Sequence, residues 1–493
     1  MSESSKKPTA PRDRVPFWEK LALGVGALSA FFGYAGVSTL AYPVYNMLLK
    51  VNAGWVGTAL MIPRIWDAFS DPIMGYISDN FHSRFGRRKP FIVIGAISMG
   101  VLFALLWYVP ESWSDSAKII WFIGLQLIYF TCYTIFAVPY GSLSYELTPD
   151  YNERTRVMAY CAFFHKSGEF LSGWMIPLAT ALGAWLIAAE KLEMTGIHSM
   201  AWLIGLLVMA GLGSMPGLLV RERFVRKTAK QSKVKILDSI KDSLSSKAFV
   251  VLVAVIVLNT LSGVLASGID QYLLVYYMND GSEAAGLLQK GLLTSGYAVV
   301  GFISIPIITW LASLFGKKGS LYFVYSLMAF GGVMKWFIFA PGHPIWDVNL
   351  MIVSFKLDPV ILIDPLLCGP MWVAVKIMLA SMMADICDED ELLHGQRREG
   401  MFSAVFSWIE KAVVSFSYMG TGIALNFSGF SPDFGAEQPA GTFFLMRLFL
   451  AGAPAITAVM ALFALYFYPI TAQHAEKTRA ALEERRGAIS ADQ

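Results

Sequence analysis

The chain has 493 residues, of which 56% are hydrophobic and 15% are charged, and its formal net charge is +3. A soluble protein usually carries about 25% charged residues, so this composition excludes an ordinary soluble domain. Apolar runs longer than about 18 residues recur along the whole chain, which is typical of a helical protein that crosses a membrane many times. The small net charge indicates no particular partner, and we expect no binding to nucleic acid.

Twelve membrane-spanning helices are predicted, which makes the expected fold an all-α membrane protein. The first 20 residues are polar and lack the short apolar core of a cleaved signal peptide, so the first span is expected to act as an uncleaved anchor. The predicted spans are approximately 20–48, 54–79, 90–109, 117–145, 157–188, 198–220, 247–278, 288–314, 320–340, 362–386, 400–427 and 442–470.

Basic residues gather in alternate loops, which predicts the orientation of the chain. They precede the first span and follow the second, fourth, sixth, eighth, tenth and twelfth spans, whereas the opposite loops hold only scattered lysines. An even number of spans with both termini in the cytoplasm fits this pattern. The expected location is therefore the plasma or inner membrane, with a lipid bilayer around the chain.

The longest basic stretch lies at the midpoint and separates the spans six and six. Leu237, Ile240 and Leu244 recur there at helical spacing, so part of it is either an amphipathic helix on the inner membrane face or a solvated linker. Two six-helix halves resemble the major facilitator superfamily, whose binding sites lie between the halves. The predicted segments are a tail 1–19, a half 20–220, a linker 221–246, a half 247–470 and a tail 471–493.

Three further segments are interpreted from composition. The outer loops 341–361 and 428–441 are either lids over an outer vestibule or plain loops. The tail from Thr471 is polar and alternates in charge, which favours disorder.

Two carboxylates inside the second span are the most informative polar residues. Asp67 and Asp71 are four residues apart, so both point to the same side of a helix, and Arg64 lies one turn earlier. Charged side chains at membrane depth usually face a bundle interior or a water-filled path. The two interpretations are a coupling-ion site and a structural network with Arg64.

Motifs for other kinds of chemistry are absent from the sequence. There is no GxxxxGK[ST] phosphate loop, no HExxH and no GxSxG, and the four cysteines form no CxxC pair. The sequence thus favours neither an ATP-driven pump nor an enzyme, and no cofactor is expected.

Several strings resemble one transporter family. RIWDAFSDPIMGYISDNFHSRFGRRKP begins at Arg64, PYGSLSYELTPDYNERTR covers 139–156, ADICDEDELLHGQRREG covers 384–400, and SWIEKA at 407–412 matches weakly. Together they resemble the glycoside–pentoside–hexuronide:cation symporter family, the melibiose-permease branch of the major facilitator superfamily. The resemblance extends through nearly the whole membrane portion.

The resemblance implies a cation site. Asp67 and Asp71 match the two cation-site carboxylates of helix 2, Thr134 matches a coordinating hydroxyl of helix 4, and Lys411 matches a helix 11 lysine near the site. The coupling ion is then Na⁺ or H⁺. A lysine opposite two buried carboxylates would balance their charge when no ion is bound.

The sugar-binding residues of the family are changed in this chain. Its helix 1 acidic residue, helix 4 acidic residue, helix 4 tryptophan and helix 5 arginine fall at Phe31, Ala137, Gly141 and Ala162. The next turn of helix 5 instead holds His165, Lys166 and Glu169. Lys166 and Glu169 either pair on one helix face or, with His165, bind an anionic or hydroxylated substrate.

Other polar and aromatic residues are weaker candidates for the substrate site. Asp270 and Gln271 are candidates for polar lining, and Trp66 and Trp372 for stacking on a sugar, although tryptophan more often anchors a membrane interface. Lys335, Lys376 and Arg447 are expected to extend toward a membrane boundary or to pair internally.

Charged residues at the predicted cytoplasmic helix ends are interpreted as gate ion pairs, with orientation charges as the alternative. The predicted gate residues are Asp79, Arg84, Arg87, Arg88, Glu146, Arg154, Asp385, Arg397 and Arg398.

We therefore predict a cation-coupled symporter that works by alternating access on a small-molecule substrate, expected to be a sugar or glycoside. The alternatives are a transporter of a lipid-like substrate or organic anion, and a membrane sensor that does not transport. A monomer is expected.

Overall fold

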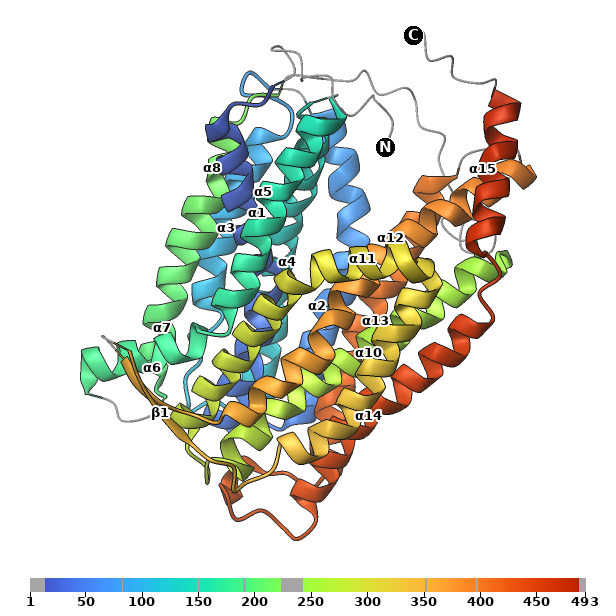
Figure 1. Cartoon of the computed structure of the whole chain (residues 1–493). Coiled ribbons are helices and arrows are strands. Elements are labelled where there is room, and N and C mark those ends of the chain that lie inside the picture. The colour runs from blue at the N-terminus through green and yellow to red at the C-terminus, as the bar shows by residue number, and fades with distance from the viewer. Residues whose placement is uncertain are drawn as a thin grey trace. The chain divides into compact units, whose positions relative to one another are not determined.

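The computed structural model describes residues 14–81, 83–148, 150–188, 192–222, 243–350, 353–394 and 398–486. Almost all regular structure in these residues is helical (Figure 1). The chain divides into two compact units, which we describe separately. The first unit contains Met1–Gln231, Leu274–Ala298 and Leu425–Gln438, and the second contains Ser232–Leu273, Val299–Ala424 and Pro439–Gln493.

The helices before the central basic segment belong to the first unit. They are α1 (Phe17–Ala41), α2 (Ala53–Asn80), α3 (Lys89–Leu105), α4 (Asp115–Glu146), α5 (Tyr151–Ser172), α6 (Met175–Ile187), α7 (Met194–Leu203) and α8 (Gly213–Leu219). Two π-helical segments, Tyr42–Leu48 and Ile204–Leu212, continue α1 and join α7 to α8.

The later elements complete the fold. They are α10 (Lys247–Tyr272), α11 (Glu283–Ile338), α12 (Ile363–His394), α13 (Glu399–Phe427), α14 (Thr442–Tyr466), α15 (Ala472–Arg486) and the strands β1 (Trp346–Leu350) and β2 (Val353–Leu357). Short segments are the π-helical Leu273–Tyr277 and the 3₁₀ turns Pro359–Leu362 and Pro432–Phe434.

Polar side chains begin the long helices. Asn52, Ser114, Asp150 and Ser246 each accept a hydrogen bond from a backbone N–H in the first turn of α2, α4, α5 and α10. Such caps satisfy donors that a helix leaves unpaired at its start. α3 instead begins with Pro90, whose missing N–H has no cost in the first turn.

Many helices are long enough to cross a bilayer. Seven in the described residues are long and apolar enough, or eight if α5 and α6, which bend by 52°, form one span. α11 has 56 residues, but Gly316 inside it has φ 69°, which breaks the helix into two parts.

Helices in the first unit approach closely where glycine replaces a side chain. α1 packs on α5 and α8, and α3 packs on α4 and on the π-helical segment before α8. A Cβ added to Gly100 of α3 would lie 2.2 Å from the carbonyl oxygen of Gly205, so this contact needs glycine. The aromatic core beside it includes Tyr45 stacked on Phe122 at 4.0 Å.

The second unit has its own apolar core. α10 packs along α14, and the core combines side chains such as Phe249, Met378, Phe402 and Leu465. The Lys335 ammonium lies 2.5 Å from a carboxylate oxygen of Asp364, and both side chains are buried. Lys335 therefore pairs internally, which was one of the two predicted outcomes.

Two expectations about loops and tails are corrected. Within the predicted outer loop 341–361, residues 346–350 and 353–357 form the antiparallel strands β1 and β2 rather than a plain loop. The tail expected to be disordered contains α15, which packs on α12 and buries Leu482 and Thr478. The amphipathic helix predicted around Leu237 and Ile240 lies outside the described residues.

Candidate functional site

Two carboxylates lie near the middle of α2, as the sequence predicted. Asp67 is 1% exposed and Asp71 is partly exposed. A buried carboxylate is costly unless it is hydrogen-bonded or paired with a positive charge. The contacts of these two side chains therefore indicate what the site can hold.

Hydroxyl groups gather around both carboxylates. The Thr134 hydroxyl of α4 lies 3.0 Å from an oxygen of Asp67 and 3.1 Å from an oxygen of Asp71, so it donates to either one. The Ser70 hydroxyl lies 3.1 Å from that of Thr134, and both residues are buried. Four side chains thus place oxygen atoms around two negative charges. This donor set suits a small hard cation or a proton.

Two prolines in α2 stand on either side of the carboxylates. Pro63 and Pro72 lack an N–H, so each leaves a carbonyl one turn earlier without its helical hydrogen bond. For Pro63 this carbonyl is that of Ala59, and the Gln126 side chain of α4 donates to it at 3.3 Å. α4 therefore supports α2 about two helical turns before the carboxylates.

Arg64 has a structural environment. Its guanidinium lies between the rings of Tyr34 and Phe130, at 3.9 and 4.4 Å from their centroids, and it donates a hydrogen bond to the Tyr34 carbonyl oxygen. The side chain is buried. These contacts give Arg64 a structural role in holding α2 against the helices that carry Tyr34 and Phe130.

The polar turn of α5 is partly accessible. Lys166 and Glu169 form the predicted pair at 2.6 Å, with side chains 22% and 29% exposed. The His165 ring meets the edge of Phe31 with centroids 5.1 Å apart. His165 thus lies beside the position where the resembling family has its helix 1 acidic residue.

The remaining substrate candidates belong to the second unit. Asp270 and Gln271 are buried, and the Gln271 amide donates to the Gly268 carbonyl oxygen at 3.2 Å. The Trp372 ring packs so closely on α10 that a Cβ at Gly263 would lie 2.2 Å from it. Lys411 is half-buried on α13. The expected approach of Lys411 to the carboxylates of α2 would join the two units and stays a prediction.

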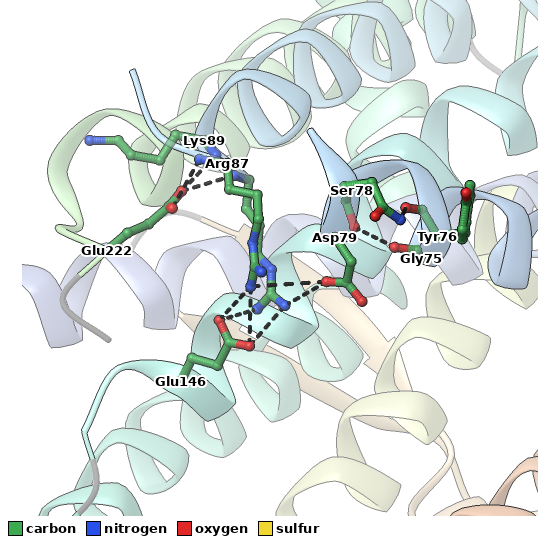
Figure 2. Close-up of polar contacts among 10 residues, drawn as sticks. Gly75, Tyr76, Ser78, Asp79, Arg87, Lys89, Glu146 and Glu222 are labelled. Atoms are coloured by element: carbon green, nitrogen blue, oxygen red, sulfur yellow. Dashed lines mark hydrogen bonds and ion pairs between the residues drawn. The ribbon is translucent and has the colours of Figure 1, made fainter. Parts of the chain in front are cut away.

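A charged network joins α2, α3 and α4 (Figure 2). Arg88 lies 3.0 Å from Asp79 and 2.8 Å from Glu146, and Arg87 lies 3.1 Å from Glu146. The Glu222 carboxylate accepts hydrogen bonds from the backbone N–H groups of Arg87, Arg88 and Lys89 at 2.9–3.2 Å. A negative charge at the start of α3 is favourable because the unpaired N–H groups of a helix start carry partial positive charge.

The second unit has charged contacts at the end of α12. Lys317, next to the break in α11, lies 2.6 Å from Asp385. Arg398 lies 2.5 Å from Asp390, and His474 of α15 lies 2.9 Å from Glu389. Acidic side chains of one helix thus contact three other segments of the unit.

Some predicted gate residues are not part of these contacts. Arg84 stacks on the neighbouring Phe85 at 4.7 Å, and Arg154 donates to the Thr148 carbonyl oxygen at 3.2 Å. Arg84 lies in the turn between α2 and α3, and Arg154 lies in the first turn of α5. Arg397 lies outside the described residues.

Ser70 and Glu222 were not predicted from the sequence as members of these sites. Ser70 carried one signal, because it lies three residues after Asp67 and therefore near the same helix face. No sequence pattern indicated the contact of Glu222, because Glu222 lies 135 residues from Arg87 in a stretch interpreted as a linker.

Long helices, intramembrane carboxylates and charged helix ends together define a multi-pass membrane transporter rather than an enzyme. The sequence of residues 22–472 matches the family described as MFS/sugar transport protein, and the chain belongs to this family. The resemblance inferred from sequence strings is thereby confirmed.

Named relatives and one solved structure extend this assignment. The chain is 25% identical to the glucuronide carrier protein homolog of Escherichia coli, covering 91% of each chain. It is 22% identical to sodium-dependent lysophosphatidylcholine symporter 1 of Gallus gallus, covering 96% of this chain and 90% of the relative. The structure of the nucleoside transporter NupG superimposes with a TM-score of 0.64 at 13% identity, covering 90% of this chain and 99% of that one, which supports the fold alone.

Proposed function

We propose that the protein is a cation-coupled symporter of a sugar or glycoside that works by alternating access. The observation that carries the proposal is the Thr134 hydroxyl placed within 3.1 Å of both Asp67 and Asp71 in the middle of α2. Together with Ser70, these side chains bind the coupling ion, Na⁺ or H⁺. Binding of the ion raises the affinity for the co-substrate, because the two occupy the same conformation of the transporter.

Twelve spans follow if the helices that are more polar or shorter are included. α11 is one of the seven strongly apolar helices, and dividing it at Gly316 makes eight spans. The joined α5 and α6 and the helices α2, α3 and α13 bring the number to twelve. In this proposal both termini are cytoplasmic, the halves are 20–220 and 247–470, and a monomer transports. The tails 1–19 and 471–493 and the linker 221–246 then lie on the cytoplasmic side.

The charged contacts at the helix ends act as cytoplasmic gate pairs in this proposal. Asp79, Arg87, Arg88 and Glu146 serve in the first unit, with Asp385 and Arg398 in the second. Ion pairs near a surface are individually weak, so they suit a switch between states of similar free energy.

A second candidate is transport of a lipid-like substrate on the same fold. α2 exposes large apolar side chains on the helix that also holds the carboxylates: Trp66, Phe69, Ile73, Tyr76 and Ile77. An acyl chain next to the ion site would cover them, and the relative from Gallus gallus is named for such a substrate. A sensor that does not transport is disfavoured because it needs no coupling ion.

Uptake into proteoliposomes tests the proposal. Labelled mono- and disaccharides are offered with imposed Na⁺ and H⁺ gradients applied separately, for the wild type and Asp71→Asn. We expect accumulation driven by one gradient and a loss of about tenfold or more in Asp71→Asn, since the variant lacks one of two charges that hold the ion.

The exposed residue Glu111 provides a matched control, because Glu111→Gln also removes one negative charge, but outside the described helices. This control should transport like the wild type. Unchanged accumulation by Asp71→Asn would contradict the ion site, and accumulation of a lysophospholipid but no sugar would favour the second candidate.

A further inference from the structure

One lysine lies in the middle of a membrane-spanning helix of the second unit. Lys376 is 17 residues from each end of the apolar segment Pro359–Leu393. The next charged residues of α12 are Asp364, 12 residues earlier, and Asp385, 9 residues later. These separations are about 18 and 13 Å along the helix. They exceed the reach of a lysine side chain, so Lys376 does not extend to a membrane boundary, which was one of the two sequence interpretations.

The face of α12 that carries Lys376 is accessible, and after Lys376 it is lined by small side chains. Lys376 is exposed, and so are Ala380 and Ala384, which follow at spacings of four on the same face. In the described part of α12, the exposed large apolar side chains lie near the helix ends: Ile363, Leu366 and Leu393. A lysine facing lipid at mid-depth is strongly unfavourable, so charged residues there usually face a water-filled cavity. This face of α12 therefore lines an aqueous path and not the bilayer.

A neighbouring helix adds charged and hydroxyl side chains to this face. Glu410 of α13 interacts electrostatically with both Lys376 and Lys411, and Glu410 is only partly exposed. Ser403 and Ser407 are exposed and precede Lys411 at spacings of four. The three charged side chains carry one net positive charge when all are ionised.

Lys335 of α11 is a buried lysine with a structural role and provides a comparison for Lys376 of α12. The Lys335 ammonium is buried against Asp364 at 2.5 Å, so its charge is matched one to one. In the part of the chain that the structure describes, Lys376 makes no ion pair within 4.0 Å. Its charge is thus compensated only at longer range and remains available to a ligand.

We propose that Lys376 binds an oxyanion of the co-substrate, a carboxylate or a phosphate. This inference rests on the proposed symport function and adds a residue that selects substrates by charge. Glu410 is the counter-charge of Lys376 in the empty transporter, and the oxyanion replaces it as the nearer partner when the co-substrate binds. A neutral co-substrate leaves the Lys376–Glu410 interaction in place and is bound less tightly.

The test compares charged and neutral members of two matched pairs of probes. The first pair is 4-nitrophenyl β-D-glucuronide and 4-nitrophenyl β-D-glucoside, which differ by a carboxylate. The second is lysophosphatidylglycerol and monoacylglycerol, which differ by a phosphate-bearing headgroup. Uptake by the full-length protein in proteoliposomes is measured under the imposed cation gradients for the wild type, Lys376→Gln and Lys376→Arg. Lys247→Gln is the control, because Lys247 is an exposed lysine at the start of α10.

We expect Lys376→Gln to raise the KM for the charged member of one pair about tenfold or more, because a charge-assisted hydrogen bond is lost. The KM for its neutral member should change less than about twofold. Lys376→Arg should retain uptake within a few-fold of the wild type, and Lys247→Gln should match it. An effect confined to the first pair assigns the oxyanion as a carboxylate, and one confined to the second assigns it as a phosphate.

Equal losses for both members of a pair would mean a structural role for Lys376 and would overturn the inference. Accumulation of the neutral glucoside alone would also overturn it while leaving symport intact. If the wild type accumulates no probe under either gradient, the proposed function fails and the inference fails with it.

Discussion

The charged corner at α2, α3 and α4 and the one at the end of α12 differ in how their basic side chains contact carboxylates. In the first unit, Arg87 and Arg88 are 8% and 5% exposed and share Glu146. In the second unit, Lys317 is 37% exposed and meets the single carboxylate of Asp385.

The difference follows from the geometry of the basic group. A guanidinium offers several N–H donors in a plane, so Arg88 bridges Asp79 and Glu146 at the same time. An ammonium is a point charge and pairs readily with one carboxylate. The first corner is therefore a network with several shared partners, whereas Lys317 in the second corner pairs with one carboxylate.

The largest effect is expected from Arg88→Ala. It removes the cation that lies nearest to both Asp79 and Glu146 and leaves only Arg87, at 4.0 and 3.1 Å, to neutralise them. The cost should be about 2–3 kcal/mol, because the carboxylates are partly solvated. The apparent Tm of the purified protein should fall by several degrees, and uptake should fall with it. Arg88→Lys should recover only part of the loss, and a variant as stable as the wild type would contradict a network role.

Glu222→Gln should have an intermediate effect. The amide keeps one acceptor oxygen but loses the negative charge that faces the N–H groups of Arg87, Arg88 and Lys89, so we expect a loss of about 1 kcal/mol. Hydrogen–deuterium exchange should report faster exchange at these three amides. Glu111→Gln serves as the control, and unchanged exchange at residues 87–89 would argue against the contact.

The sequence predicted most residues whose partners lie on the same or neighbouring helices. The spacing of Asp67 and Asp71 places them on one face of α2. The resemblance added Thr134, whose hydroxyl lies 3.0 and 3.1 Å from their carboxylate oxygens, and its role at a cation site stays a prediction. Ser70 was missed because a serine in an apolar helix usually bonds its own backbone, which Ser70 also does through the Asp67 carbonyl oxygen.

Contacts between distant segments were harder to predict. Glu222 reaches the start of α3 only because the chain returns there after α8. Arg84 and Arg154 have the right charge and lie near the network in sequence, yet each has a local partner. The tail after Thr471 is polar in composition, but a few buried positions such as Leu482 hold α15 on α12.

The smallest effect is expected from Lys317→Ala, and its dependence on salt distinguishes the two corners most directly. Because Lys317 is more than one-third exposed, its pair with Asp385 should contribute no more than about 1 kcal/mol, and about 1 M salt should remove most of that. The loss from Arg88→Ala should persist at the same salt concentration, since Arg88 is almost fully buried. Apparent Tm values of both variants and of Lys317→Arg, measured across a salt series, provide the check. If the two alanine variants lose equal stability with equal salt dependence, burial and bridging would not explain the difference between the corners.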